Sequence, residues 1–95
     1  MNVSYKPAFR KFVKKQSRAF QLAIEDEVYE IIKSPQEGEA KKGDLEGMRV
    51  HKFRFQEREY LAAYSINVKD VMFYMIGTHE NFYRTLKSYL KEVDK

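Results

Sequence analysis

The apolar residues of this chain change their spacing once, at a polar, glycine-containing segment that covers residues 35–47. Before that segment they recur every three or four positions, which is typical of helices, and after it they alternate, which is typical of strands. The helical stripe consists of Phe20, Ala23, Ile24, Val28, Ile31 and Ile32. The alternating part begins with residues 49–55, Arg-Val-His-Lys-Phe-Arg-Phe. Because the two patterns occupy separate stretches, the sequence predicts an α+β fold.

The first half is predicted to hold a short strand at residues 2–5 and then two helices. The first helix starts at Pro7, because a missing N–H costs nothing in a first turn. Ser17 is predicted to cap the second helix, and that helix should end at Ser34, because the residue before Pro35 resists helical geometry. The two helices should form a hairpin.

The second half is predicted to be a meander of three strands followed by a helix. Residues 49–55, 60–66 and 71–77 form the strands, with four-residue turns between them. Thr78 is predicted to cap the last helix, whose stripe includes Phe82, Leu86, Tyr89 and Leu90. We therefore expect an antiparallel sheet of about four strands, packed by two N-terminal helices and a C-terminal helix in the order β-α-α-β-β-β-α.

The composition narrows the class of protein. A chain of 95 residues suffices for one domain, which we expect to span residues 1–95. It has no cysteine, which excludes a disulfide framework, a thiolate nucleophile and a cysteine zinc site. No apolar run approaches the roughly 18 residues of a membrane span, and the first residues do not resemble a signal peptide. We expect a soluble cytoplasmic protein.

Positive charge is concentrated in two blocks, within a net charge of +4. The first block comprises Lys6, Arg10, Lys11, Lys14, Lys15 and Arg18, and the second comprises Arg49, His51, Lys52, Arg54 and Arg58. Clustered cations suit polyanions such as nucleic acid. Two solvated faces explain them equally well, so charge alone leaves both interpretations open.

Alternation in the first strand of the meander divides its charged residues between two faces. Lys52 and Arg54 share one face with Val50, about 6.5–7 Å apart, a spacing that suits neighbouring phosphate oxygens. His51 shares the other face with Phe53, which we expect to pack on the helices, so His51 is interpreted as structural. No carboxylate stands at ligand spacing from either histidine, and no metal site or cofactor is predicted.

The predicted order of elements, β-α-α-β-β-β-α, together with three segments between residues 45 and 83, resembles the RelE/ParE family of bacterial toxins, and the resemblance covers essentially the whole chain. Leu45-Glu46-Gly47-Met48 resembles the leucine-x-glycine turn before their second strand. Residues 60–64, Tyr-Leu-Ala-Ala-Tyr, resemble their "YRLVY" strand, and residues 76–83, Ile-Gly-Thr-His-Glu-Asn-Phe-Tyr, resemble the "GTH" end of YafQ-type members. One departure stands out, because Leu61 replaces the arginine of "YRLVY".

The resemblance implies a toxin of a toxin–antitoxin system that cuts messenger RNA on the ribosome without a metal. It implies catalytic roles for Lys52 and Arg54 as the paired cations, His79 as the base and Tyr83 near the family's C-terminal tyrosine. RNA contacts are expected from Arg49, Arg58, Lys11, Lys14 and Lys15. The expected partners are a cognate antitoxin, the ribosome and messenger RNA.

Other interpretations stay open at this stage. The same fold serves ParE-like proteins that inhibit DNA gyrase and cut nothing, and a degenerate relative would keep antitoxin binding alone. His79 fits a strand–helix turn and Tyr83 fits a helical core stripe without any catalytic role. The N-terminal basic block suits either an RNA backbone or an acidic stretch of an antitoxin.

Overall fold

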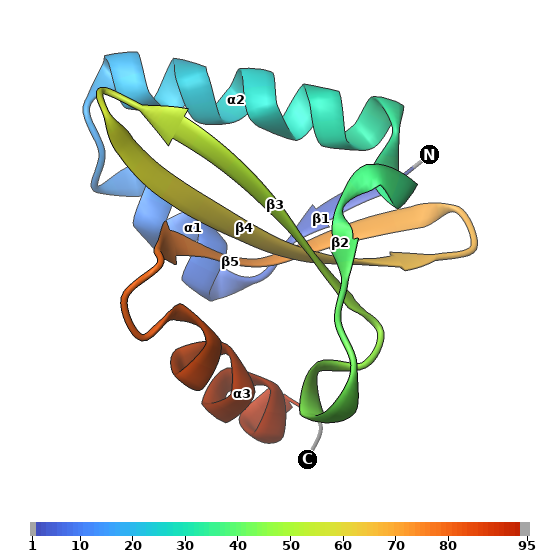
Figure 1. Ribbon diagram of the computed structural model, residues 1–95. Coiled ribbons are helices and arrows are strands. Elements are labelled where there is room, and N and C mark those ends of the chain that lie inside the picture. The colour runs from blue at the N-terminus through green and yellow to red at the C-terminus, as the bar shows by residue number, and fades with distance from the viewer. Residues whose placement is uncertain (1, 94–95) are drawn as a thin grey trace.

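The chain folds around a five-stranded sheet with helices on both faces, in a computed structural model that describes residues 2–93 (Figure 1). In chain order the elements are β1 (Asn2–Tyr5), α1 (Pro7–Lys14), α2 (Arg18–Lys33), β2 (Glu39–Ala40), β3 (Met48–Phe55), β4 (Arg58–Asn67), β5 (Asp70–Thr78) and α3 (Phe82–Val93). Short 3-10 turns at Pro35–Glu37 and Gly43–Leu45 flank β2. Helices α1 and α2 cover one face of the sheet, and α3 covers the other.

The predicted α+β class and the three-strand meander are confirmed, but the sheet is larger and not wholly antiparallel. Its strand order is β1-β5-β4-β3-β2, and β1 runs parallel to β5. The fifth strand, β2, pairs Glu39 with Val50 and Ala40 with Arg49. Two polar or small residues show no hydrophobic period, so β2 leaves no pattern in the sequence.

The predicted boundaries of the first two helices are confirmed. Pro7 occupies the first turn of α1. The Ser17 hydroxyl accepts a hydrogen bond from the Phe20 N–H at 3.2 Å and so caps α2. Helix α2 ends at Lys33, directly before Ser34 and Pro35. These boundaries depend on contacts within three or four residues, which explains why the sequence predicts them.

The hairpin turns are tighter than predicted, and α3 starts later. Gln56 and Glu57 alone connect β3 to β4, with φ of 50° and 66°, in the left-handed conformation that two-residue hairpins require. Thr78 does not cap α3, because it pairs with Tyr60 at the end of β5. Residues 79–81 form a turn first, closed by a 3.2 Å bond from the Phe82 N–H to the His79 carbonyl.

Two apolar cores result, one on each face of the sheet. The core under α1 and α2 contains Phe9, Phe20, Ile24, Val28, Ile31, Phe53, Ala62, Tyr64, Val71, Phe73 and Ile76. The core under α3 contains Leu45, Met48, Val50, Leu61, Ala63, Phe82 and Leu86. Residues 61–64 of β4 are all buried, because the central strand is covered on both sides. In the described part of the chain, no helix is both long and apolar enough to cross a membrane.

Segment 35–47 packs against Tyr64 of the sheet, and two of its glycines, Gly38 and Gly47, occupy positions that a side chain would disturb. The Tyr64 hydroxyl donates a 2.6 Å bond to the Pro35 carbonyl, and a Cβ at Gly38 would lie 2.1 Å from that hydroxyl oxygen. Burial raises the pKa of the Tyr64 phenol. Gly47, in the leucine-x-glycine turn, has a φ of 92°, which side chains rarely tolerate. These contacts position β2 to pair with the edge of β3.

Candidate active site

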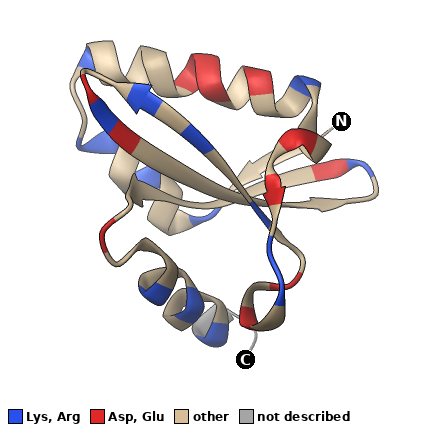
Figure 2. Cartoon of the chain, in the orientation of Figure 1, with Lys and Arg blue, Asp and Glu red and all other residues tan. Residues whose placement is uncertain are grey.

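Basic residues lie along β3 (Figure 2), and strand alternation places Lys52 and Arg54 on the α3 side of the sheet. Earlier on the same face of β3, Met48 and Val50 are buried against Phe82 and its neighbours in α3. The next two residues in alternation, Lys52 and Arg54, are exposed. The strand period thus places both cations on one face, as the sequence predicts.

Strand β4 forms the floor beside these cations. Leu61 lies opposite Lys52 on one side and opposite Gly77 of β5 on the other. Its side chain is 0% exposed, so it belongs to the core under α3 and offers no charge. Glu59 lies opposite Arg54 and is exposed. The floor is therefore apolar under Lys52 and acidic next to Arg54.

His79 and Tyr83 lie next to each other on the α3 side of the sheet, the side that also carries Lys52 and Arg54. Their rings lie at 80° with centroids 5.9 Å apart, because the turn at residues 79–81 and the first residues of α3 bring them together. Tyr83 is partly buried against the core under α3, whereas His79 is exposed. A phenol ring supported by packing thus lies edge-on to an accessible imidazole, a group that can accept or donate a proton.

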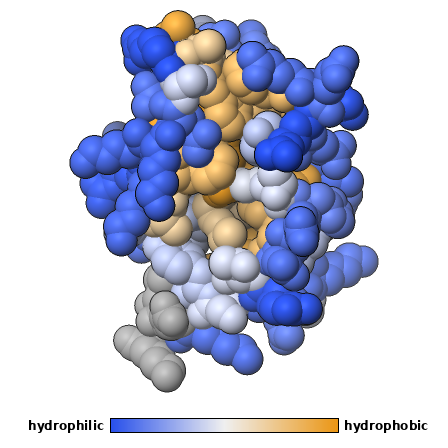
Figure 3. Space-filling model, turned by 90° about the vertical axis from the view of Figure 1, so that its left-hand side faces the viewer, coloured by the Kyte–Doolittle hydropathy of each residue, from blue (hydrophilic) through white to orange (hydrophobic). Residues whose placement is uncertain are grey.

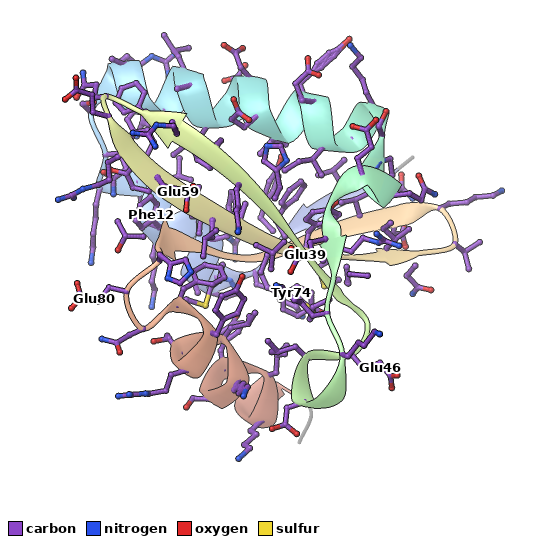
Figure 4. The ribbon with its side chains drawn as sticks, viewed as in Figure 1. Phe12, Glu39, Glu46, Glu59, Tyr74 and Glu80 are labelled. Carbon is purple, nitrogen blue, oxygen red and sulfur yellow. The ribbon has the colours of Figure 1, made fainter. Side chains whose placement is uncertain are left out.

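Glu39 and Lys41, at β2, connect the two halves of the site. Lys41 forms an ion pair with Glu39, and its Nζ lies 4.7 Å from the centre of the Tyr83 ring. The hydrogen bond from Lys41, and then that lysine's charge, lower the pKa of the Glu39 carboxyl, and the charge of Lys52 adds to the effect. The same hydrogen bond raises the pKa of Lys41. In Figure 4 the Glu39 carboxylate extends from β2 toward β3.

Two arginines predicted as RNA contacts lie outside this cluster. Arg49 points to the α2 side, where its guanidinium donates to the carbonyls of Gln36 and Gly38 at 2.8 and 2.7 Å. Arg58 alternates with the floor residues of β4 and shares the side of Tyr60, next to the hairpin turn. Arg49 therefore holds segment 35–47 in place.

The remaining predicted residues lie on the helical side. Lys11, Lys14 and Lys15 are exposed on α1 or directly after it, away from Lys52. His51 donates from Nε2 to a carboxylate oxygen of Glu27 in α2 at 2.8 Å, which confirms its interpretation as a structural residue. The structure therefore places Lys52, Arg54, His79 and Tyr83 on the α3 side of the sheet, whereas Arg49, Lys11, Lys14 and Lys15 lie on the side of α1 and α2.

Sequence reasoning missed three charged residues at the site, Glu39, Lys41 and Glu59. The first two belong to a segment that reads as a polar loop, and their position depends on the β2–β3 pairing. Glu59 was assigned to a turn, although the alternation of β4 extended by two residues would have placed it beside Leu61. Within residues 2–93, no three His, Asp or Glu side chains gather in a way that would hold a metal ion.

A hollow of about 390 Å³ with both polar and apolar lining includes Thr78 and Glu80, the two chain neighbours of His79. Figure 3 shows the side of the molecule on which an apolar band runs between hydrophilic flanks. The apolar lining of the hollow comes from Phe12, Tyr60, Met75, Ile76 and Phe82. Thr78 and Glu80 also line it, and Glu80 points away from the sheet in Figure 4. Gln16, Arg58 and Thr85 complete the lining, so the predicted RNA contact Arg58 shares this hollow with both chain neighbours of His79.

Comparison with solved structures identifies the fold. Isolated Escherichia coli RelE toxin has a TM-score of 0.63 at 14% identity, covering 92% of this chain and 96% of its own. A chain of the intact E. coli RelBE toxin–antitoxin complex has a TM-score of 0.65 at 14% identity, and the match covers 81% of this chain and 94% of that one. A conserved hypothetical protein of Helicobacter pylori has a TM-score of 0.52 at 16% identity, and the match covers 84% of this chain and 96% of that protein. The class defined by these likenesses is that of proteins with the RelE fold.

A family model places the chain within that class. Residues 3–87 match the ParE-like toxin of type II bacterial toxin–antitoxin systems, and the chain belongs to this family. Among curated proteins, none matches it. The protein is thus the toxin of a toxin–antitoxin system.

Proposed function

We propose that this toxin is a ribosome-dependent, metal-independent endoribonuclease that cleaves messenger RNA and inhibits translation. The observation that carries the proposal is the gathering of exposed Lys52 and Arg54 with the His79–Tyr83 pair on one side of the sheet. Metal-free RNA cleavage needs cations at the phosphate, a base and a hydrogen-bond donor, and these four side chains supply them. We propose a cytoplasmic location as well, because the proposed partners, ribosomes and messenger RNA, meet there.

In the proposed reaction, the RNA 2′-hydroxyl attacks the adjacent phosphorus while the His79 imidazole accepts its proton. Lys52 and Arg54 stabilise the negative charge that develops on the phosphate oxygens. The bond between the phosphorus and the 5′-oxygen breaks, and that oxygen takes a proton from solvent water and leaves as a hydroxyl, while His79 returns its proton to solvent. Tyr83 orients His79 or donates a hydrogen bond to the departing oxygen. The products are a 2′,3′-cyclic phosphate and a 5′-hydroxyl end.

Inhibition of DNA gyrase without cleavage is the second candidate. Two observations favour it: the matching family model is described as ParE-like, and the position of the family arginine is filled by buried Leu61. Both candidates use the same fold, so the target must be identified by activity.

Cleavage of messenger RNA on programmed ribosomes is the test, with Arg54→Ala, His79→Ala and His51→Ala compared with the wild type. Arg54→Ala and His79→Ala are each expected to lower the cleavage rate by ~100-fold or more, the usual scale for a catalytic group. His51 is the matched control on the opposite face, and its replacement should change the rate by less than about twofold. A wild type that cuts nothing but blocks DNA supercoiling would establish gyrase as the target.

An antitoxin partner is proposed as well, docked in the groove between α1 and α2. This groove of about 650 Å³ has an apolar floor that includes Phe9, Ile24 and Val28. Its exposed rim carries Arg10, Lys11, Lys14 and Arg18. An apolar floor with a basic rim fits an amphipathic helix with acidic edges better than it fits a bare RNA backbone.

Charge reversal at this rim is expected to weaken antitoxin binding. Replacing Lys11 and Lys14 together by glutamate should raise the Kd for the purified cognate antitoxin by at least about tenfold, measured by calorimetry. Lys87→Glu in α3 serves as the control, because Lys87 is exposed outside the groove. If the double variant binds antitoxin normally and instead loses cleavage, the rim contacts RNA and the docking proposal is wrong.

A further inference from the structure

We propose that Lys41 supplies a phosphate-binding cation at this site, because the buried Leu61 provides no charge, and that the Glu39 carboxylate pairs with Lys41 until an RNA phosphate replaces it. The inference rests on the nuclease function proposed above and deepens it. Leu61 is 0% exposed beneath Lys52, so the floor of the site contributes no positive charge. Lys41 reaches the same face of the sheet from its edge.

The backbone of β2 fixes where Lys41 lies. Glu39 pairs with Val50, and two residues later the Lys41 N–H donates to the Met48 carbonyl at 2.9 Å. Lys41 and Glu39 are therefore on the face that Val50 and Met48 share, which is the α3 side. Glu39 is consequently a diagonal neighbour of Lys52 across the two strands.

The side chain of Lys41 is already held in position. It is 18% exposed, its Nζ lies 4.7 Å from the centre of the Tyr83 ring, and it forms an ion pair with Glu39. An ammonium that is ordered before binding loses little conformational entropy when it grips a phosphate. The cation thus stands between the strand that carries Lys52 and the helix that carries Tyr83.

Glu39 is placed as an internal substitute for a phosphate. Its carboxylate forms an ion pair with Lys41 and is also attracted by the charge of Lys52. The Glu39 side chain is 61% exposed, so it leaves the site without disrupting the core. An exposed ion pair is weak, and a phosphate of the RNA backbone exchanges readily for its carboxylate. The two lysines then grip one backbone from opposite sides.

The experiment separates this role from a structural one. Lys41→Met keeps a stem to pack on Tyr83 but removes the charge, and Lys41→Arg keeps the charge. Lys42→Met is the matched control, because Lys42 is the exposed neighbouring lysine. Each variant is titrated with a 2′-O-methyl RNA oligonucleotide, which cannot be cleaved, over a range of salt concentrations. Cleavage on programmed ribosomes is measured in parallel.

Lys41→Met is expected to lower cleavage by about tenfold or more and to reduce the salt slope of RNA binding by about 0.7, the loss of one phosphate contact on a single strand. Lys41→Arg and Lys42→Met should keep the wild-type slope, and Glu39→Gln should tighten binding severalfold. An unchanged slope in Lys41→Met overturns the inference even if cleavage falls, because Lys41 would then act only by positioning Tyr83. Weaker binding by Glu39→Gln overturns the role of Glu39. A wild type that does not cleave contradicts the proposed function instead, and the binding slopes still decide the phosphate contact.

Discussion

Replacement of Phe73 by alanine is expected to lower the free energy of unfolding by about 3–5 kcal/mol, the usual cost of deleting a buried aromatic ring. Phe73 lies in β5 and is 0% exposed. Its ring lies 5.4, 5.3 and 5.8 Å, between centroids, from those of Tyr5, Phe9 and Tyr64, which come from β1, α1 and β4. The cavity would therefore open where three elements meet.

Urea unfolding followed by circular dichroism would measure this loss. Tyr29→Ala is the control, because Tyr29 is an aromatic residue with 58% exposure, and it should change stability by less than about 0.5 kcal/mol. Phe73→Leu provides a milder variant in case the alanine variant does not fold. Losses below about 1 kcal/mol in the alanine variant would show that Phe73 is not the central contact of this core.

Leu61→Arg, which restores the arginine of the resembling toxins, is expected to destabilise the protein by about 2–5 kcal/mol. The leucine side chain is wholly buried on the α3 side, and Lys52 lies directly opposite on β3. An arginine there gives up apolar packing and places a second cation beside Lys52. We expect no gain in RNA cleavage, because the packing of α3 over this floor would be disturbed.

Thermal or urea unfolding of Leu61→Arg and of Leu61→Met would check this expectation. The methionine variant conserves volume and should cost less than about 1.5 kcal/mol. A Leu61→Arg variant that is as stable as the wild type and cleaves faster would mean that this floor accommodates the arginine. Such a result would also remove the reason for assigning its role to Lys41.

The cations of β3 are the part of the site that the sequence predicts best. A strand exposes alternate residues, so Lys52 and Arg54 had to share one face and His51 the other once residues 49–55 were identified as a strand. His79 and Tyr83 are four residues apart at the start of a helix, and that local spacing brings their rings together. Each pair follows from contacts within its own segment.

The rest of the site depends on pairings between distant segments. Lys41 and Glu39 reach the site because β2 pairs with β3, and Arg49 is diverted to the carbonyls of Gln36 and Gly38 by the same pairing. Nothing in the spacing of residues 35–47 reveals this pairing, because its interactions are polar and join residues on either side of a turn. The start of α3 was mispredicted for a related reason, since β5 extends through Thr78 by pairing with Tyr60.

Local patterns in the chain predict the α+β class, the two helices that begin at Pro7 and after Ser17, the meander and the faces of its strands. Those features arise from hydrophobic period and from capping, which act over a few residues. The tertiary structure alone decided that β1 lies parallel to β5, that β2 borders β3, and that the β3 cations and the His79–Tyr83 pair occupy one side. Strand order and edge pairing are set by which apolar faces bury together over the whole chain, and no local pattern encodes that choice.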